Sequence, residues 1–184
     1  LGADLVTLNG SKMYGPKQTG MLYVKTGVQV SPIIRGGGQE WNLRSGTENV
    51  PGIIGFNTAL TNAVNNQGKS NNELKVLQNY FIEGIKQISG NAVINGSIAY
   101  RLPNNVHVTF PGIDNERLMM ELDEQGIMCA VGSACSASND EPSHVLIAIG
   151  LSDADAQASL RFSMSKHTTK ADINYTLKIL KKLI

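Results

Sequence analysis

Apolar positions along the chain recur with two periods, one typical of strands and the other typical of helices. Short continuous or alternating apolar runs predict strands at 3–8, 21–25, 105–112, 127–131 and 159–165. Apolar residues spaced three and four positions apart predict helices at 50–64, 73–88, 114–126, 144–151 and 170–184. This mixture of strands and helices indicates an α/β fold class, with a short α+β domain in the second half.

A polar segment at 65–72 separates the two halves of this pattern. Its Gly and Asn residues are expected to stop the helix that begins at Val50. We therefore predict two domains, residues 1–66 and residues 67–184. The first apolar run, at 3–8, has no turn or cap before it, so the chain is expected to begin in the middle of a fold.

The helix predicted at 114–126 carries signals at both of its ends. Asp114 is a candidate N-cap, because a short carboxylate can accept a hydrogen bond from the first turn. Gly126 follows the last turn, where glycine commonly ends a helix. Arg117 stands where a capping box would have Glu or Gln, so a simple cap is expected instead.

The composition is that of a globular chain with almost no net charge. The 184 residues are 41% hydrophobic and carry a formal net charge of +1, so they can bury a core and give no electrostatic reason to expect nucleic acid or an anionic membrane as a partner. No apolar run approaches the roughly 20 residues that cross a bilayer. The N-terminus also lacks the basic start of a leader peptide. We predict a soluble, cytoplasmic protein.

Two irregular stretches contain residues suited to chemistry. Lys12 lies in a turn rich in Gly and Pro, with Asn9 and Ser11 beside it. Such a lysine is most often only a solvated charge. The segment 44–47, RSGT, precedes a helix start, where backbone N–H groups favour a phosphate, although a plain flexible loop is an equally good interpretation. The chain contains no P-loop motif.

The two cysteines, Cys129 and Cys135, have different surroundings. Their five-residue separation matches neither a redox pair nor a usual zinc pair, so we expect neither a disulfide nor a metal site. Cys129 lies in an apolar run and is expected in the core. Cys135 lies among Gly, Ala and Ser in a loop, which leaves its thiol uncovered and makes it the candidate nucleophile.

Three separated segments together resemble the cysteine desulfurase family. SKMYGPKQTG (11–20) resembles its cofactor-lysine segment, and GGGQEWNLRSGTEN (36–49) resembles its phosphate-contacting loop. The segment from Gly132 to Ile173 resembles its cysteine loop and the following carboxylate-binding strand. The resemblance implies the aspartate-aminotransferase-like fold type I of enzymes that use pyridoxal 5'-phosphate. It also implies that this chain is the C-terminal portion: the end of the large domain plus the small domain.

The resemblance also implies a role for each matching residue in the first segment and the loop. Lys12 corresponds to the lysine that holds pyridoxal 5'-phosphate, and Asn9 and Ser11 to residues that contact its phosphate. Thr47 corresponds to a residue that contacts the phosphate from the partner subunit of a homodimer. Family members often have Ser at the position of Asn9 and His at the position of Ser11, so the phosphate contacts are expected to differ in detail.

Further roles are implied in the second half of the chain. Arg161 corresponds to the arginine that binds the carboxylate of the substrate L-cysteine, through a geometry that suits guanidinium better than ammonium. Cys135 corresponds to the residue that takes the substrate sulfur as a persulfide and releases alanine. The long loop around it is expected to carry the sulfur to an acceptor, such as an iron–sulfur scaffold protein.

Some alternatives stay open at this stage. The histidine that stacks on the cofactor ring and the aspartate that pairs with its nitrogen lie upstream in the family, so the 184 residues alone are expected to be inactive. His107 and His144 are expected to pack or cap rather than to catalyse. A selenocysteine lyase, another enzyme of the same fold or a non-catalytic remnant remain alternatives. An ordinary aminotransferase would not need a thiol in such a loop.

Overall fold

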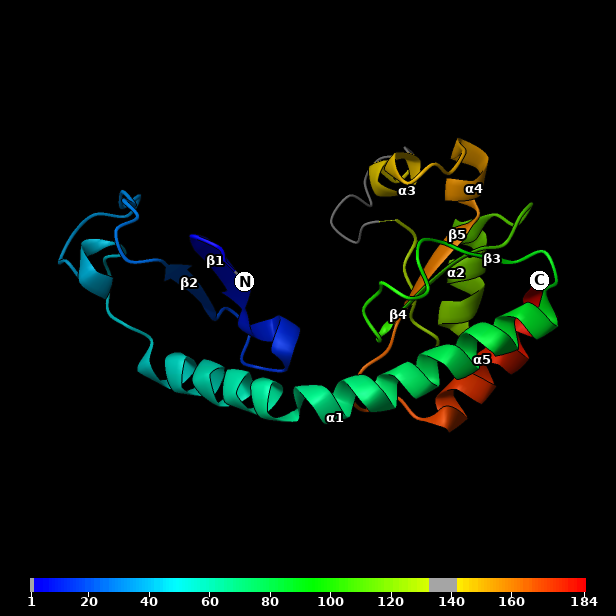
Figure 1. Ribbon diagram of the computed structural model, residues 1–184, viewed down its shortest axis with the longest axis horizontal. Helices are drawn as coiled ribbons and strands as arrows, with labels where there is room; N and C mark the ends of the chain where they lie inside the picture. The colour runs from blue at the N-terminus through cyan, green and yellow to red at the C-terminus, as the bar shows by residue number, and fades with distance from the viewer. Residues whose placement is uncertain (1, 133–141) are drawn as a thin grey trace. The chain divides into compact units, whose positions relative to one another are not determined.

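The computed structural model describes residues 2–132 and 142–184 (Figure 1). The contacts within the chain divide it into two compact units, Leu1–Gln67 and Gly68–Ile184. Each unit is described by itself below. The assignment of these units to the end of a large domain and to a small domain stays a prediction.

The first unit contains a β-hairpin with an unusually long connection. Strand β1 (Leu5–Asn9) pairs antiparallel with β2 (Gly20–Val24), as the apolar runs predict. A short 3₁₀ helix, η1 (Gly10–Met13), lies in the connection between them. After β2 the chain is irregular as far as α1, apart from the 3₁₀ turn η2 (Glu40–Asn42). The hairpin thus presents η1 at one of its ends.

The helix α1 (Val50–Ile88) is continuous for 39 residues and takes part in both units. The prediction that the helix stops at the polar segment 65–72 is therefore wrong. Asn, Ser and Gly lower helix stability by up to about 1 kcal/mol each relative to Ala. Helix formation is cooperative, however, and the helix is anchored by buried side chains on both sides of this segment, Phe56 before it and Phe81, Ile82 and Ile85 after it, so the helix continues through it.

The second unit is built on a small antiparallel sheet. Its strands β3 (Val93–Ile94), β4 (Asn105–Thr109) and β5 (Ser159–Ser163) lie in the order β3-β4-β5. Residues 127–131 were expected to form a strand, and this prediction is wrong. Only Ala130 makes a bridge, to Arg161, because a single residue there is in register with β5.

Four further helices belong to the second unit. They are α2 (Asn115–Glu124), α3 (His144–Ala148), α4 (Asp153–Gln157) and α5 (Lys170–Leu183). Three of them confirm the helical periods found in the sequence. The short strand β3 and the helix α4 were not predicted, because two residues are too few to show a period and the α4 sequence DADAQ has no large apolar side chain.

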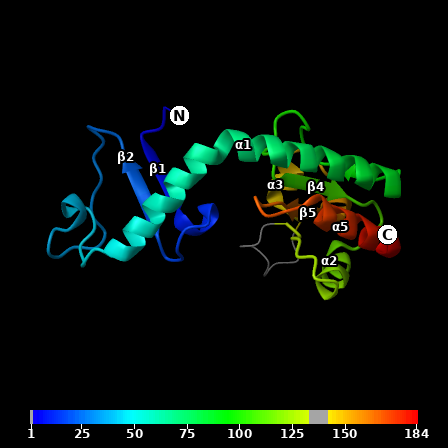
Figure 2. The same cartoon turned by 90° about the horizontal axis from the view of Figure 1, so that it is seen from below.

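One face of the sheet forms the core of the second unit. Val106 and Val108 of β4 and Leu160 of β5 are fully buried on this face, and Phe162 meets the ring of Phe81 edge to face at 5.2 Å. The side chains of α2, α5 and the C-terminal half of α1 complete the core. Figure 2 shows α5 lying along α1, where Gly84 leaves room for the side chain of Leu177.

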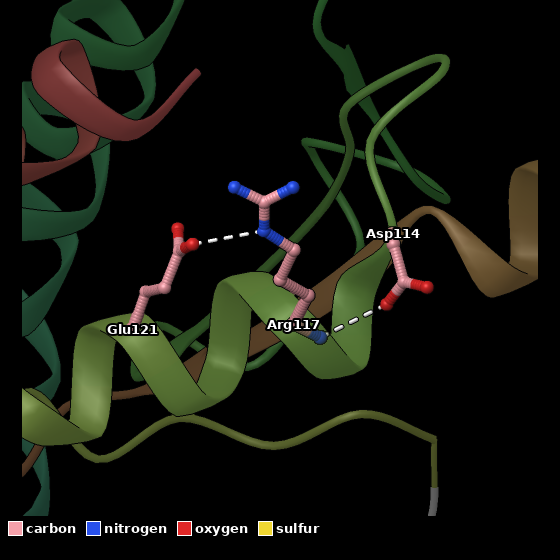
Figure 3. A network of polar contacts seen from close by, with 3 residues as sticks. All are labelled: Asp114, Arg117 and Glu121. Carbon is pink, nitrogen blue, oxygen red and sulfur yellow. Dashed lines mark hydrogen bonds and ion pairs between the residues drawn. The ribbon is translucent and has the colours of Figure 1, made fainter.

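The start of α2 follows the sequence prediction (Figure 3). The carboxylate of Asp114 accepts a hydrogen bond from the backbone N–H of Arg117 at 2.9 Å, and Gly126 follows the helix with φ of 75°. The guanidinium of Arg117 in turn donates to Glu121 at 2.9 Å, which raises the pKa of Arg117. Within residues 2–132 and 142–184, no helix is long and apolar enough to cross a membrane.

Candidate active site

Lys12 lies on η1, whose first turn is fixed by its neighbours. The side-chain oxygen of Asn9 caps this turn and accepts hydrogen bonds from the backbone N–H of Ser11 at 3.0 Å and from its hydroxyl at 2.8 Å. Lys12 itself is exposed. Asn9, Ser11 and Lys12 therefore lie together on one exposed turn.

Close packing holds this turn against α1. The backbone N–H of Gly10 donates to the carbonyl of Thr19 at 2.8 Å, and a Cβ on Gly10 would collide with the Thr19 hydroxyl. A Cβ on Gly55 would lie only 2.6 Å from the ring of Pro16, and one on Gly15 would lie 3.1 Å from the Cβ of Ala59. Glycines thus allow the lysine-bearing turn and the helix to approach more closely than larger residues would.

The loop that carries Thr47 is held by hydrogen bonds between its own residues. The backbone N–H of Gly46 donates to the side-chain oxygen of Gln39 at 3.0 Å, and the buried Ser45 donates through its N–H to the carbonyl of Ile34 at 3.3 Å. Thr47 is exposed. The loop presents Thr47 outward, as a contact with another subunit would require.

The backbone of this loop is strained at η2. The three consecutive residues of η2 have positive φ values of 46°, 55° and 62°. Each such residue costs of order 1–2 kcal/mol unless its surroundings fix it. Here the N–H of Asn42 donates to the carbonyl of Gly38 at 3.0 Å, so the turn is closed by the glycine-rich segment before it.

The donor set around Lys12 fits a phosphorylated aldehyde such as pyridoxal 5'-phosphate. An exposed lysine amine can condense with an aldehyde, and the amide group of Asn9 supplies N–H donors for a phosphate. The Ser11 hydroxyl has its proton directed at Asn9, so it would have to rotate to donate to a phosphate. The residues present therefore suit the group, with Asn9 as the main local phosphate donor.

Arg161 lies in the second unit on the polar face of β5. Its neighbours Leu160 and Phe162 point into the core on the opposite face, which fixes the position of the strand. The backbone of Arg161 pairs with His107 of β4 on one side and exchanges two hydrogen bonds with Ala130, at 2.8 and 3.1 Å, on the other. Its buried Nε has no hydrogen-bond partner among the described residues.

A buried polar network surrounds His107 on the same face. The amide nitrogen of Asn95 lies 3.1 Å from the ring nitrogen Nδ1 of His107 and 3.1 Å from the hydroxyl of Ser159. The Thr109 hydroxyl donates to the Asn95 oxygen at 3.0 Å. Burial, then Arg161, then Arg101 lower the pKa of His107 from 6.5 to about 4, so its ring is neutral at pH 7.

The structure describes only one of the two cysteines. Cys135, the candidate nucleophile, lies outside the described residues. Cys129 packs against the core, and burial is the main cause that raises its pKa from 9.0 to about 11. The expectation that Cys129 is a core residue is confirmed. In the part of the chain that the structure describes, no three His, Cys, Asp or Glu side chains gather as metal ligands would.

Comparison with known proteins identifies the family. The family model described as aminotransferase class-V matches residues 1–176. The chain belongs to this family. Among curated relatives, the cysteine desulfurase IscS of Dictyoglomus turgidum is 42% identical over 184 residues, which cover 100% of this chain and 47% of the relative. Cysteine desulfurase IscS 1 of Archaeoglobus fulgidus is 40% identical, covering 100% of this chain and 48% of the relative.

Solved structures agree with this family assignment. A NifS-like protein matches with a TM-score of 0.88 and 32% identity, covering 99% of this chain and 46% of the other. A NifS-like protein from Rickettsia africae also gives a TM-score of 0.88, with 31% identity and coverage of 99% and 48%. The predicted desulfurase resemblance and fold type I are confirmed. The chain spans about half the length of the curated relatives that it matches.

The structure brings together some of the predicted site residues and places other polar residues beside them. Asn9, Ser11 and Lys12 lie on one turn, whereas Arg161 belongs to the other unit. The cluster of His107 with Asn95 was not predicted as part of the site. The strand pattern could have placed His107 and Arg161 on polar faces, but the register that makes them neighbours depends on the folded sheet.

Proposed function

We propose that this chain is the C-terminal portion of a cysteine desulfurase. The protein would use pyridoxal 5'-phosphate to remove sulfur from L-cysteine, giving alanine and an enzyme persulfide. The names and identities of the relatives support this activity. The observation in the structure that carries it is the backbone pairing of Arg161, the candidate carboxylate ligand, with Ala130, five residues before Cys135.

This pairing limits how far the candidate nucleophile can lie from the candidate substrate ligand. Five residues span at most about 18 Å when fully extended. Cys135 therefore stays within that distance of Ala130, which is bonded to Arg161. A tether of this length allows the thiol to meet the sulfur of a substrate bound at Arg161.

Each candidate residue has a definite task in this reaction. Arg161 binds and orients the substrate carboxylate, and the amine of Lys12 takes and returns a proton at the substrate Cα. Asn9, Ser11 and, from the partner subunit, Thr47 bind the cofactor phosphate. When bound, pyridoxal 5'-phosphate supplies an electron sink for the bonds at Cα.

Cys135 performs the sulfur transfer as a thiolate. Its sulfur attacks the sulfur of the substrate, so an S–S bond forms while the substrate C–S bond breaks. The carbon left behind takes a proton and leaves as alanine. One sulfur atom remains on Cys135 as a persulfide, which a thiol or scaffold acceptor can receive.

The assembly and setting belong to the same proposal. We expect a homodimer, because the outward position of Thr47 suits a contact with a partner subunit. An iron–sulfur scaffold protein is the expected sulfur acceptor, and the cytoplasm is the expected location. Neither nucleic acid nor a membrane is expected as a partner, since the net charge is only +1.

One experiment tests the nucleophile and has a matched control within the chain. The intact protein, as the cell makes it, is loaded with pyridoxal 5'-phosphate and exposed briefly to L-cysteine, and its peptides are analysed by mass spectrometry. We expect alanine release and one added sulfur on Cys135. Cys135→Ser should abolish both, whereas Cys129→Ser should retain them. Full activity of Cys135→Ser would refute the assignment.

A second experiment locates the cofactor lysine. Borohydride reduction fixes the cofactor covalently on the lysine that holds it, and peptide mapping then identifies that residue. We expect the label on Lys12, because its turn is packed against α1 and capped by Asn9. A label on Lys17 or Lys25 would refute this role for Lys12.

A further inference from the structure

His107 and Arg161 are direct neighbours across two strands. They stand opposite each other in the antiparallel register of β4 and β5, so their side chains project from the same face. The next residues on each strand, such as Val108 and Leu160, are fully buried on the other face. Core packing therefore holds the two strands in the register that places this histidine beside this arginine.

The ring of His107 is held in one orientation by Asn95. The amide nitrogen of Asn95 is a donor, so Nδ1 of the ring acts as the acceptor at 3.1 Å and the ring proton lies on Nε2. Asn95 is itself fixed, because Thr109 donates to its oxygen and its amide also reaches Ser159. A buried network thus ends on the histidine ring.

The charges around the ring keep it neutral. Arg161 faces it from β5, and Arg101 faces it from the segment between β3 and β4. Arg101 is held by hydrogen bonds to the carbonyls of Ser97 and Asn95. Among the described residues, the hydrogen-bond partners in this network are the uncharged side chains of Asn95, Ser159 and Thr109. A neutral imidazole is therefore the only form that avoids a third positive charge here.

We propose that His107 is a positioning residue for Arg161: its ring, held in place by Asn95, lies beside the Arg161 side chain across the two strands and so limits the guanidinium to orientations that bind a substrate carboxylate. The buried Nε of Arg161 has no partner among the described residues. A buried donor without an acceptor is costly, and a carboxylate oxygen of the ligand would satisfy it. This role rests on the proposed function of Arg161 as the carboxylate ligand.

Substitutions of His107 distinguish the effect of its hydrogen bond to Asn95 from the effect of its side-chain volume. His107→Leu keeps most of the side-chain volume but removes the acceptor for Asn95. His107→Asn keeps a neutral acceptor near the position of Nδ1, so it should rescue the function. His107→Gln, which cannot place its acceptor there, replaces the leucine variant if the latter does not fold. His144→Asn, on the exposed start of α3, is the matched control.

The first measurement follows the arginine directly and needs no turnover. The Nε–H signal of Arg161, assigned with Arg161→Lys, is recorded by NMR while acetate is added to the 184-residue chain. Wild type and His107→Asn should show a saturable shift. His107→Leu should bind about tenfold more weakly, the size expected for one lost positioned hydrogen bond. Equal acetate binding by wild type and His107→Leu, or no response in wild type, would overturn the proposal.

The second measurement uses the intact protein loaded with pyridoxal 5'-phosphate and L-cysteine as the substrate. His107→Leu should raise KM about tenfold with kcat nearly unchanged, since only carboxylate binding is affected, while His107→Asn and His144→Asn should stay close to wild type. A fall in kcat at constant KM would overturn the positioning role. If wild type shows the acetate response but releases no alanine, the desulfurase proposal fails while the inference about His107 stands.

Discussion

The raised pKa of Cys129 predicts that its thiol is alkylated much more slowly than the thiol of Cys135. Burial raises its pKa from 9.0 to about 11, against a smaller opposing effect of its own backbone hydrogen bond, and Asp123 adds to the increase. At pH 8, a thiol with a pKa of 9.0 is about one-tenth thiolate, whereas one with a pKa of 11 is about one-thousandth thiolate. Since only the thiolate reacts, the expected rate of alkylation falls about a hundredfold from the pKa alone.

Timed alkylation with iodoacetamide measures this difference residue by residue. The 184-residue chain is treated at pH 8, samples are quenched at intervals, and the two cysteine peptides are quantified by mass spectrometry. Cys135 should be alkylated at least about a hundredfold faster than Cys129 in the folded chain. In denaturant the two rates should converge, because the burial that raises the pKa of Cys129 is lost.

The comparison has an internal control and a clear contrary result. Cys135→Ser removes the faster thiol, so any alkylation that remains reports Cys129 alone. This variant should react slowly until it unfolds. If Cys129 in the folded chain reacts within a few fold of its rate in denaturant, its packing against the core does not suppress the thiolate, and the distinction drawn between the two cysteines is wrong.

Three further predictions concern stability. Gln78→Leu should lower the free energy of unfolding in urea by about 2 kcal/mol, because the buried Gln78 amide donates to two backbone carbonyls at 2.7 and 2.8 Å. Gln87→Leu, on the exposed face of the same helix, should change this free energy little, and equal effects of the two substitutions would refute the role of the Gln78 hydrogen bonds. Asp114→Ala should lower the free energy of unfolding by about 1 kcal/mol through loss of the N-cap, whereas Arg117→Ala should lower it less, because the ion pair of Arg117 with Glu121 is exposed. The reverse order in thermal unfolding would contradict the role of the cap. The lowered pKa of His107 means that the free energy of unfolding should fall as the pH drops from 6.5 toward about 4, because the unfolded chain then takes up a proton on this histidine that the folded chain does not. Urea titrations across this range should show a loss of about 2 kcal/mol, a value lowered from about 3 kcal/mol because the ring is partly exposed. His107→Asn should not show this loss.

The sequence was a good guide wherever a period or an end signal extended over several residues. The strand pair of the first unit, the strands β4 and β5, and the cap at Asp114 all follow from local patterns. The continuous α1 could not be predicted, because local propensity favours a stop at 65–72. Packing on both sides of that segment overrides this preference, and packing partners distant in sequence are not visible in a local window.

In the candidate site, too, local features could be predicted from the sequence and contacts between distant segments could not. The turn at Lys12 could be predicted, since its Asn9 cap and its glycines are all local. The surroundings of Arg161 could not, because they come from three segments far apart in the chain. Asn95 and His107 reach Arg161 only through the register of the sheet, and Ala130 only through an isolated bridge.

The strand β5 links the two halves of the proposed reaction. Its core residues Leu160 and Phe162 fix the strand, and the alternation of side chains then sets Arg161 on the polar face. The backbone of the same arginine holds Ala130, where the chain leaves for the cysteine loop. A shift of β5 would therefore move Arg161, the proposed carboxylate ligand, and Ala130 together. Under the proposed function, the chain between Ala130 and Cys135 limits how far the thiol can lie from a carboxylate bound at Arg161. Changes in the length of this segment should therefore alter sulfur transfer while leaving carboxylate binding unchanged.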